Sequence, residues 1–250
     1  MAVFQLDAEG NDLADPANVR YFLMSSLPHG AGSGPGICQQ NRNPLAPNPV
    51  LRALLVDLDQ WVSSGTDPPA SRMPRRADGT LVPALPQESV GFPAIPGVVY
   101  NGRNHTGDLF DFGPLFDKGI LSIVPPKLMG TPYPALVPRT DADGNDVAGI
   151  RLPDVAVPLA TYTGWNLRAV PPGANDGCDA SGQKIDLSET QADRLASGDP
   201  RLSIEERYPT HDGYVNAVTR AATDLEQQRL LIDQDVQQYI RTAEQSAIGR

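Results

Sequence analysis

One histidine is the side chain of this sequence best suited, by type and position, to acid–base chemistry. His29 follows the apolar stretch Tyr21–Met24 and stands between Pro28, which cannot continue a β-ladder, and the glycine-rich loop Gly30–Gly36. In open α/β sheets, ligands and chemistry gather outside the carboxyl ends of parallel strands. His29 is therefore a candidate general base, and the alternative is a loop histidine that only caps a turn.

Other catalytic and ligand-binding signatures are missing from the sequence. No stretch matches the Gly-x-Ser-x-Gly nucleophile elbow, because the serine in Gly30–Gly34 stands in the wrong place. There is no phosphate-binding loop, no dinucleotide fingerprint and no His-Glu-x-x-His motif. His105 is interpreted as a turn residue, with lining a site as the alternative, and His211 as a surface residue. We therefore expect no cofactor and no metal site.

An acidic turn invites a calcium-binding interpretation. Asp141–Asp146 carries three aspartates between two extended stretches. An EF-hand loop needs glycine at its sixth position and glutamate at its twelfth, whereas Gly144 is fourth and Leu152 is twelfth. The turn of a β-hairpin is the favoured interpretation.

Two cysteines leave two alternatives open. Cys38 and Cys178 both lie in glycine-containing turns. Two cysteines are too few for a disulfide framework, and these two are too isolated for a zinc site. They either form one disulfide that closes a large ring or remain two unrelated buried thiols. A disulfide would indicate that the sequence belongs to a longer, exported protein whose signal peptide lies outside these residues.

Composition excludes several classes of partner. The chain has 250 residues and a net charge of -10, which argues against nucleic acid and anionic membrane as partners. No apolar run approaches the roughly 20 residues that a membrane span needs. Glycine (23) and proline (25) are frequent, so long irregular connections are expected.

The elements that must position His29 follow from the apolar pattern. Val19–Ser25 is predicted to be a buried strand, and Pro49–Ser64 a helix that begins after the N-cap Asn48 and ends at Gly65. The helix should pack back on the sheet through one apolar stripe, formed by Leu51, Leu54, Leu55, Leu58, Trp61 and Val62.

The rest of the chain divides by composition into three parts. Residues 1–65 hold the strand, the histidine loop and the helix; residues 66–188 form a proline-rich extended arm; residues 189–250 are helical. In the arm, Val98–Tyr100 is a candidate strand, Phe110–Phe116 should anchor the arm to the core, and Trp165 is a core or pocket residue. In the last part we expect three helical features: a capping box at Ser203–Glu206, a helix over His211–Arg229, and a final helix starting at Asp233 or Asp235.

A set of short stretches resembles the C-terminal part of a bacterial family of α/β-hydrolase-domain proteins. The stretches cover nearly the whole chain: Val19–Phe22 running to His29-Gly30, Cys38–Gln40, Asn43–Leu45, Leu51–Leu55, Pro68–Arg72, Asp78–Val82, Gly149–Val155, Tyr162–Arg168 and Ser197–Arg201. The resemblance implies a three-layer α/β sandwich whose last strand delivers the catalytic histidine, here His29.

The resemblance also implies that part of the machinery lies elsewhere. In α/β-hydrolases the triad runs Ser, Asp/Glu, His along the chain. We therefore expect the nucleophile and the acid upstream of Met1, and interpret the sequence as a segment of a longer protein. The first hypothesis is the histidine-bearing part of a serine ester hydrolase acting on a small-molecule ester. The alternative is a non-catalytic accessory or binding module in which His29 is vestigial.

Overall fold

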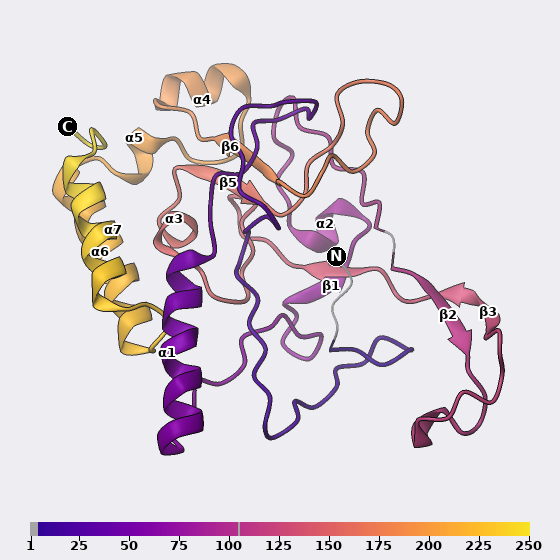
Figure 1. Cartoon of the computed structure of the whole chain (residues 1–250). Coiled ribbons are helices and arrows are strands. Elements are labelled where there is room, and N and C mark those ends of the chain that lie inside the picture. Colours follow the sequence, from indigo (N-terminus) through magenta and orange to yellow (C-terminus); the bar gives the residue numbers. More distant parts are fainter. Residues whose placement is uncertain (1–4, 105) are drawn as a thin grey trace.

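The computed structural model describes residues 5–104 and 106–250, and within them the regular elements are short and separated by long ordered loops (Figure 1). The described residues form three two-stranded antiparallel sheets: β1 with β4, β2 with β3, and β5 with β6. The strands are β1 Leu81–Pro83, β2 Asp108–Asp111, β3 Lys127–Pro132, β4 Leu136–Pro138, β5 Ala160–Thr163 and β6 Gln183–Asp186. The helices are α1 Asn48–Ser64, α2 Gln87–Val90, α3 Pro153–Ala156, α4 Gln191–Ser197, α5 Ile204–Arg207, α6 His211–Gln227 and α7 Asp233–Gln245, with a 3-10 turn at Phe116–Lys118.

The predicted strand Val19–Ser25 is extended, but it does not form a regular ladder. Phe22 makes a parallel bridge with Arg72 on one side, and Met24 makes a parallel bridge with Ile150 on the other. The backbone of Gly149 (φ +92°) passes so close that a Cβ there would lie 2.5 Å from the carbonyl oxygen of Leu23. The segment thus has parallel neighbours on both sides, each one bridge long, and the expected three-layer sandwich is not confirmed.

Helix α1 confirms the predicted helix but corrects its orientation. It begins at Asn48, with Pro47 rather than Asn48 at the N-cap, and ends at Gly65 in the left-handed conformation (φ +70°). Its buried face carries Val50, Ala53 and Asp57. The expected packing of the whole apolar stripe was wrong, because four of its members are 48–80% exposed: Leu51, Leu55, Leu58 and Val62.

The C-terminal helices agree with the prediction. Ser203 and Glu206 form the capping box that opens α5, and α6 and α7 pack against each other as a pair. The turn between them joins the core under α1, where Leu230, Leu231 and Val236 meet Val50 and Ile150. Arg229 binds Asp57 at 2.6 Å, which links this turn to α1. No helix of the described residues is both long enough and apolar enough to cross a bilayer.

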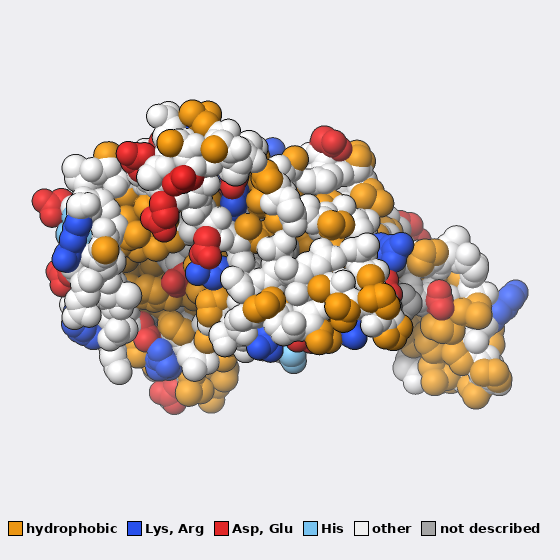
Figure 2. All heavy atoms as spheres, turned by 90° about the horizontal axis from the view of Figure 1, so that it is seen from above, with side chains coloured by type: hydrophobic (Ala, Val, Ile, Leu, Met, Phe, Trp, Pro, Cys, Tyr) orange, Lys and Arg blue, Asp and Glu red, His pale blue; other side chains and the backbone are white. Residues whose placement is uncertain are grey.

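The β2–β3 hairpin corrects the expectation that Phe110–Phe116 anchors the arm. The hairpin projects away from the body (Figures 1 and 2), and apolar side chains gather on its surface. Phe112 and Phe116 stack with ring centroids 4.9 Å apart, so the aromatic residues pack on one another rather than on the core. The exposed large apolar residues of β2, β3 and the loop between them are Phe110, Leu115, Phe116, Ile120, Leu121, Val124, Leu128 and Met129.

Three smaller expectations are settled by the structure or fall outside it. Asp141–Asp146 is a tight turn closed by the bridge between Thr140 and Asp146, but the predicted hairpin of the flanking stretches is not formed, because β4 before the turn pairs with β1. Val98–Tyr100 is irregular rather than a strand. His105 lies outside the described residues.

Candidate active-site cleft

A cleft of about 260 Å³ lies beside the segment that carries His29. Leu23, Met24 and Leu27 of that segment form one side. The opposite side is aromatic: Phe92, Tyr100 and Trp165 lie with ring centroids 5.5–5.7 Å apart. Trp165, predicted to be core or pocket, is half-buried and does both, since it packs on the cluster around Phe92 and lines the cleft. The cleft is therefore mainly apolar, as small-molecule sites usually are.

His29 lines this cleft from an exposed position, where it remains accessible to solvent. The backbone on both sides of it is fixed. Pro28 before it is buried, and the amide of Gly30 after it donates to the carbonyl of Ala180 at 3.1 Å. His29 follows the extended segment after a turn at Ser25-Ser26, and both its place at the end of a sheet strand and its role stay predictions.

A reciprocal pair of hydrogen bonds holds the start of the histidine loop. The amide of Ser26 donates to Oδ2 of Asp146 at 2.7 Å, and the amide of Asp146 donates to Oγ of Ser26 at 2.8 Å. Ser26 has a left-handed backbone (φ +59°), which is uncommon for a residue other than glycine. The two bonds explain how this conformation is held, and they join the histidine loop to the acidic turn.

Asp146 is the one acidic residue of that turn among the residues that line the cleft. It lines the cleft, yet protein surrounds it so closely that burial raises the pKa of its carboxyl to about 6. The hydrogen bond from Ser26 opposes this shift, and the nearby charge of Asp141 adds to it. At neutral pH the carboxyl is therefore ionised, but more readily protonated than an ordinary aspartate.

Around the cleft, three buried asparagines form hydrogen bonds with backbone groups that are not paired in β-ladders. Asn43 donates to the carbonyls of Ser26 (2.8 Å) and Thr163 (3.0 Å), which ties the histidine loop to β5. Asn145 accepts from the amide of Tyr162 and donates to the carbonyl of Ala160, so it pairs with the free edge of β5. Asn166 bridges two further carbonyls, those of Gln40 and Gly182. Buried backbone groups must find partners, and here side chains supply them.

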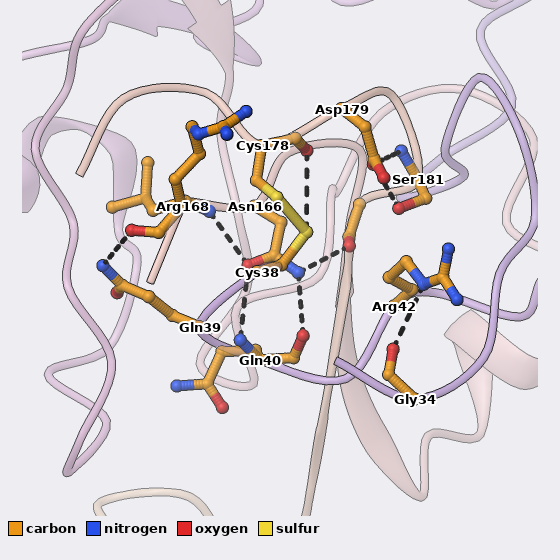
Figure 3. The surroundings of a disulfide bond; sticks show 12 residues. Gly34, Cys38, Gln39, Gln40, Arg42, Asn166, Arg168, Cys178, Asp179 and Ser181 are labelled. Carbon is orange, nitrogen blue, oxygen red and sulfur yellow. Dashed lines mark hydrogen bonds between the residues drawn. A yellow bond between two sulfur atoms is a disulfide. The ribbon is translucent and has the colours of Figure 1, made fainter. Parts of the chain in front are cut away.

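The two cysteines form a disulfide beside this network (Figure 3), which settles the alternative that the sequence left open. The Cα atoms of Cys38 and Cys178 lie 5.6 Å apart, within the normal range for a bridge. Asp179 lies within 4.8 Å of both sulfurs, but these sulfurs are bonded to each other and offer no thiolate to a metal. The bridge fastens the loop after His29 to the segment that follows Trp165.

A rim of charge borders the outer end of the cleft. Arg103 binds Asp176 at 2.9 Å, and both side chains are more than half exposed. Both residues line the cleft, so its exposed edge carries a balanced ion pair. The sequence favours a β-hairpin turn over a calcium loop at Asp141–Asp146 and does not indicate that this turn contacts the histidine loop. No local signal marks that connection, because it depends on a contact across 120 residues.

Comparison with known proteins gives one match. A family model described as "Alpha/beta hydrolase domain" matches residues 8–241. No curated protein and no solved structure matches this chain.

Proposed function

Since the chain belongs to the alpha/beta hydrolase domain family, which indicates a hydrolase-type function, we propose that it carries the general-base histidine of a serine ester hydrolase. One observation carries the proposal: His29 follows an extended segment and lines an apolar cleft large enough for a small ester. The family match does not favour the alternative of a non-catalytic binding module.

His29 transfers protons in both the acylation and the deacylation step of this proposal. It accepts the proton of the serine hydroxyl as the serine oxygen attacks the ester carbonyl, and it returns that proton to the leaving alcohol. Water then attacks the acyl-enzyme, and His29 again accepts and returns one proton. The exposed position of His29 fits this exchange, since its ring must reach both the nucleophile and the leaving group.

The nucleophile in this proposal comes from a segment outside these 250 residues. The sequence contains no Gly-x-Ser-x-Gly elbow to supply it. The outward apolar stripe of α1 supports a further segment, because Leu51, Leu55, Leu58 and Val62 form a surface that monomeric soluble proteins rarely leave open. The disulfide supports an oxidising compartment, where such bonds persist.

Hydrolysis of p-nitrophenyl butyrate tests the proposal with four proteins. They are the 250-residue chain, the longer protein encoded in the same reading frame, and the longer protein with either His29→Ala or His211→Ala. His211 is the matched control, because its ring bonds carbonyls of Glu244 and Ile248 and does not line the cleft.

The longer protein should be active and the 250-residue chain should stay at background. His29→Ala should lower kcat by roughly 10⁴-fold or more, as for other triad members, whereas His211→Ala should retain kcat. Full activity of the His29→Ala protein would refute the role of His29. Turnover by the 250-residue chain that a phosphonate inhibits would refute the external nucleophile.

A further inference from the structure

Four deeply buried carboxylates of the described residues bind an arginine, whereas Asp146, which is only partly buried, lines the cleft without such a partner. Asp57, Asp143, Asp199 and Asp235 are 3–8% exposed, and each binds an arginine. Asp146 has no ionic partner among residues 5–104 and 106–250. Its Oδ2 accepts the amide of Ser26, while its Oδ1 accepts no hydrogen bond within the same described ranges. Arg151 lowers the pKa of the Asp146 carboxyl without forming an ion pair with it, so a ligand that brings an ammonium group to Oδ1 would gain a direct charge-assisted hydrogen bond.

The surroundings of Asp146 favour a cation on an apolar body. Trp165, Tyr100 and Phe92 present aromatic surface in the same cleft, and aromatic surface attracts organic cations. Arg103 does not compete for Asp146, because it is paired with Asp176 at the rim. A cavity of about 150 Å³ can hold benzene, so the cleft, at about 260 Å³, has room for a ring with a short aminoalkyl chain.

We propose that the cleft binds a small aromatic amine, with the ammonium group on Oδ1 of Asp146 and the ring against the aromatic side. The inference rests on the proposed function, since it concerns the same cleft, and it names the substrate class as esters that carry such an amine. The experiment measures binding without hydrolysis, so its failure and the failure of the esterase proposal are separate results.

Isothermal titration at about pH 7.5, where Asp146 is ionised, tests the inference with three probes of matched size. They are 2-phenylethylamine as the cation, 2-phenylethanol as the neutral isostere and phenylacetate as the anion. The amine should bind roughly tenfold or more tightly than the alcohol, the usual gain from a hydrogen bond to a charged group, and phenylacetate should bind most weakly. Asp146→Asn should remove the preference for the amine while 2-phenylethanol still binds, which shows that the cleft is intact.

Asp186→Asn is the control, because this exposed carboxylate is paired with Lys184 and does not line the cleft. It should change amine affinity by less than about twofold, as expected for a screened surface charge. The groups that can titrate or carry charge around Asp146 are His29, Tyr100, Arg103, Asp141, Arg151 and Asp176. In the unmodified protein the amine affinity should fall as the pH drops from about 7.5 to about 5, while the alcohol affinity stays constant.

Several results would overturn the inference. Equal affinity for amine and alcohol, or a preference for phenylacetate, would show that no unpaired anion acts on the ligand. Unchanged amine affinity in Asp146→Asn would show that the ammonium group does not bind Asp146. If Asp146→Asn lost both ligands, a pH-independent amine affinity in the unmodified protein would still refute the role of Asp146.

Discussion

Replacing Asp146 by asparagine should stabilise the protein above pH 6 and leave its stability nearly unchanged near pH 4. The change keeps the size of the side chain, and the amide oxygen can still accept the hydrogen bond from Ser26. It removes the enclosed negative charge, whose burial raises the pKa of the carboxyl from 3.8 to about 6. The acidic group is thus protonated more readily in the folded protein than in the unfolded chain.

The sign and size of the effect follow from that pKa difference. Well below pH 3.8 the carboxyl is protonated in both states, so its charge costs nothing. Between pH 4 and 6 the folded state holds the proton longer, and the free energy of unfolding decreases as the pH rises. Above pH 6 the full cost is present, about 3 kcal/mol as an upper limit. Water in the cleft screens part of it, so about 1–2 kcal/mol is the expected gain for Asp146→Asn.

Urea unfolding at a series of pH values from about 4 to 8, with the disulfide kept intact, measures this gain. For a protein of this size, 1 kcal/mol corresponds to roughly 2–4 °C in Tm, so thermal unfolding gives a second reading. Asp176→Asn, an exposed position, should stay within about 0.5 kcal/mol of the unmodified protein throughout. A stability difference for Asp146→Asn that does not change with pH, or destabilisation at pH 8, would refute the reasoning.

Three further predictions concern the framework around the cleft. Reducing the Cys38–Cys178 bond, which joins residues 140 apart, should lower the free energy of unfolding by roughly 4–5 kcal/mol on the chain-entropy model. Urea unfolding with and without reductant measures this loss. The double serine variant is the control, and its stability should not respond to reductant. Arg201→Met should cost about 3–5 kcal/mol, because Arg201 is buried and binds Asp199 as well as carbonyls of β6; an unchanged Tm would contradict this. Gly149→Ala should lower the free energy of unfolding by about 2 kcal/mol or more, since its Cβ would lie 2.5 Å from a backbone oxygen. Gly65→Ala, at a similar φ but in open space, should lower it by only about 1 kcal/mol. Equal losses of stability in the two variants would show that the close contact is not the cause.

The helices could be predicted because their signals are local. The signals are the proline in the first turn of α1 and the glycine after its end, the capping box of α5, and the periodicity of α6 and α7. All of them lie within a few turns of the residues they order. The direction in which α1 points its leucines could not be predicted, because it depends on which face meets the turn after α6. The same holds for Val19–Ser25, whose parallel neighbours come from distant, irregular segments.

The candidate site was predictable only in part. Proline and glycine around His29 indicate a loop after an extended segment, and the structure agrees. The cleft and Asp146 depend on contacts between segments more than 100 residues apart. The apolar periodicity of the sequence does not predict such contacts, because the hydrogen bonds that form them join a side chain to a distant backbone group.

The three buried asparagines have a consequence for how this sequence can change through evolution. In a regular β-ladder, backbone groups bond one another whatever the side chains are, so many substitutions leave the hydrogen bonds intact. Around this cleft the same bonds depend on the identities of Asn43, Asn145 and Asn166. Each must both donate and accept in a buried space, and aspartate or leucine of similar size cannot do both. Mutational tolerance should therefore be lower at these three positions than at the apolar core positions, where one hydrophobic residue can often replace another.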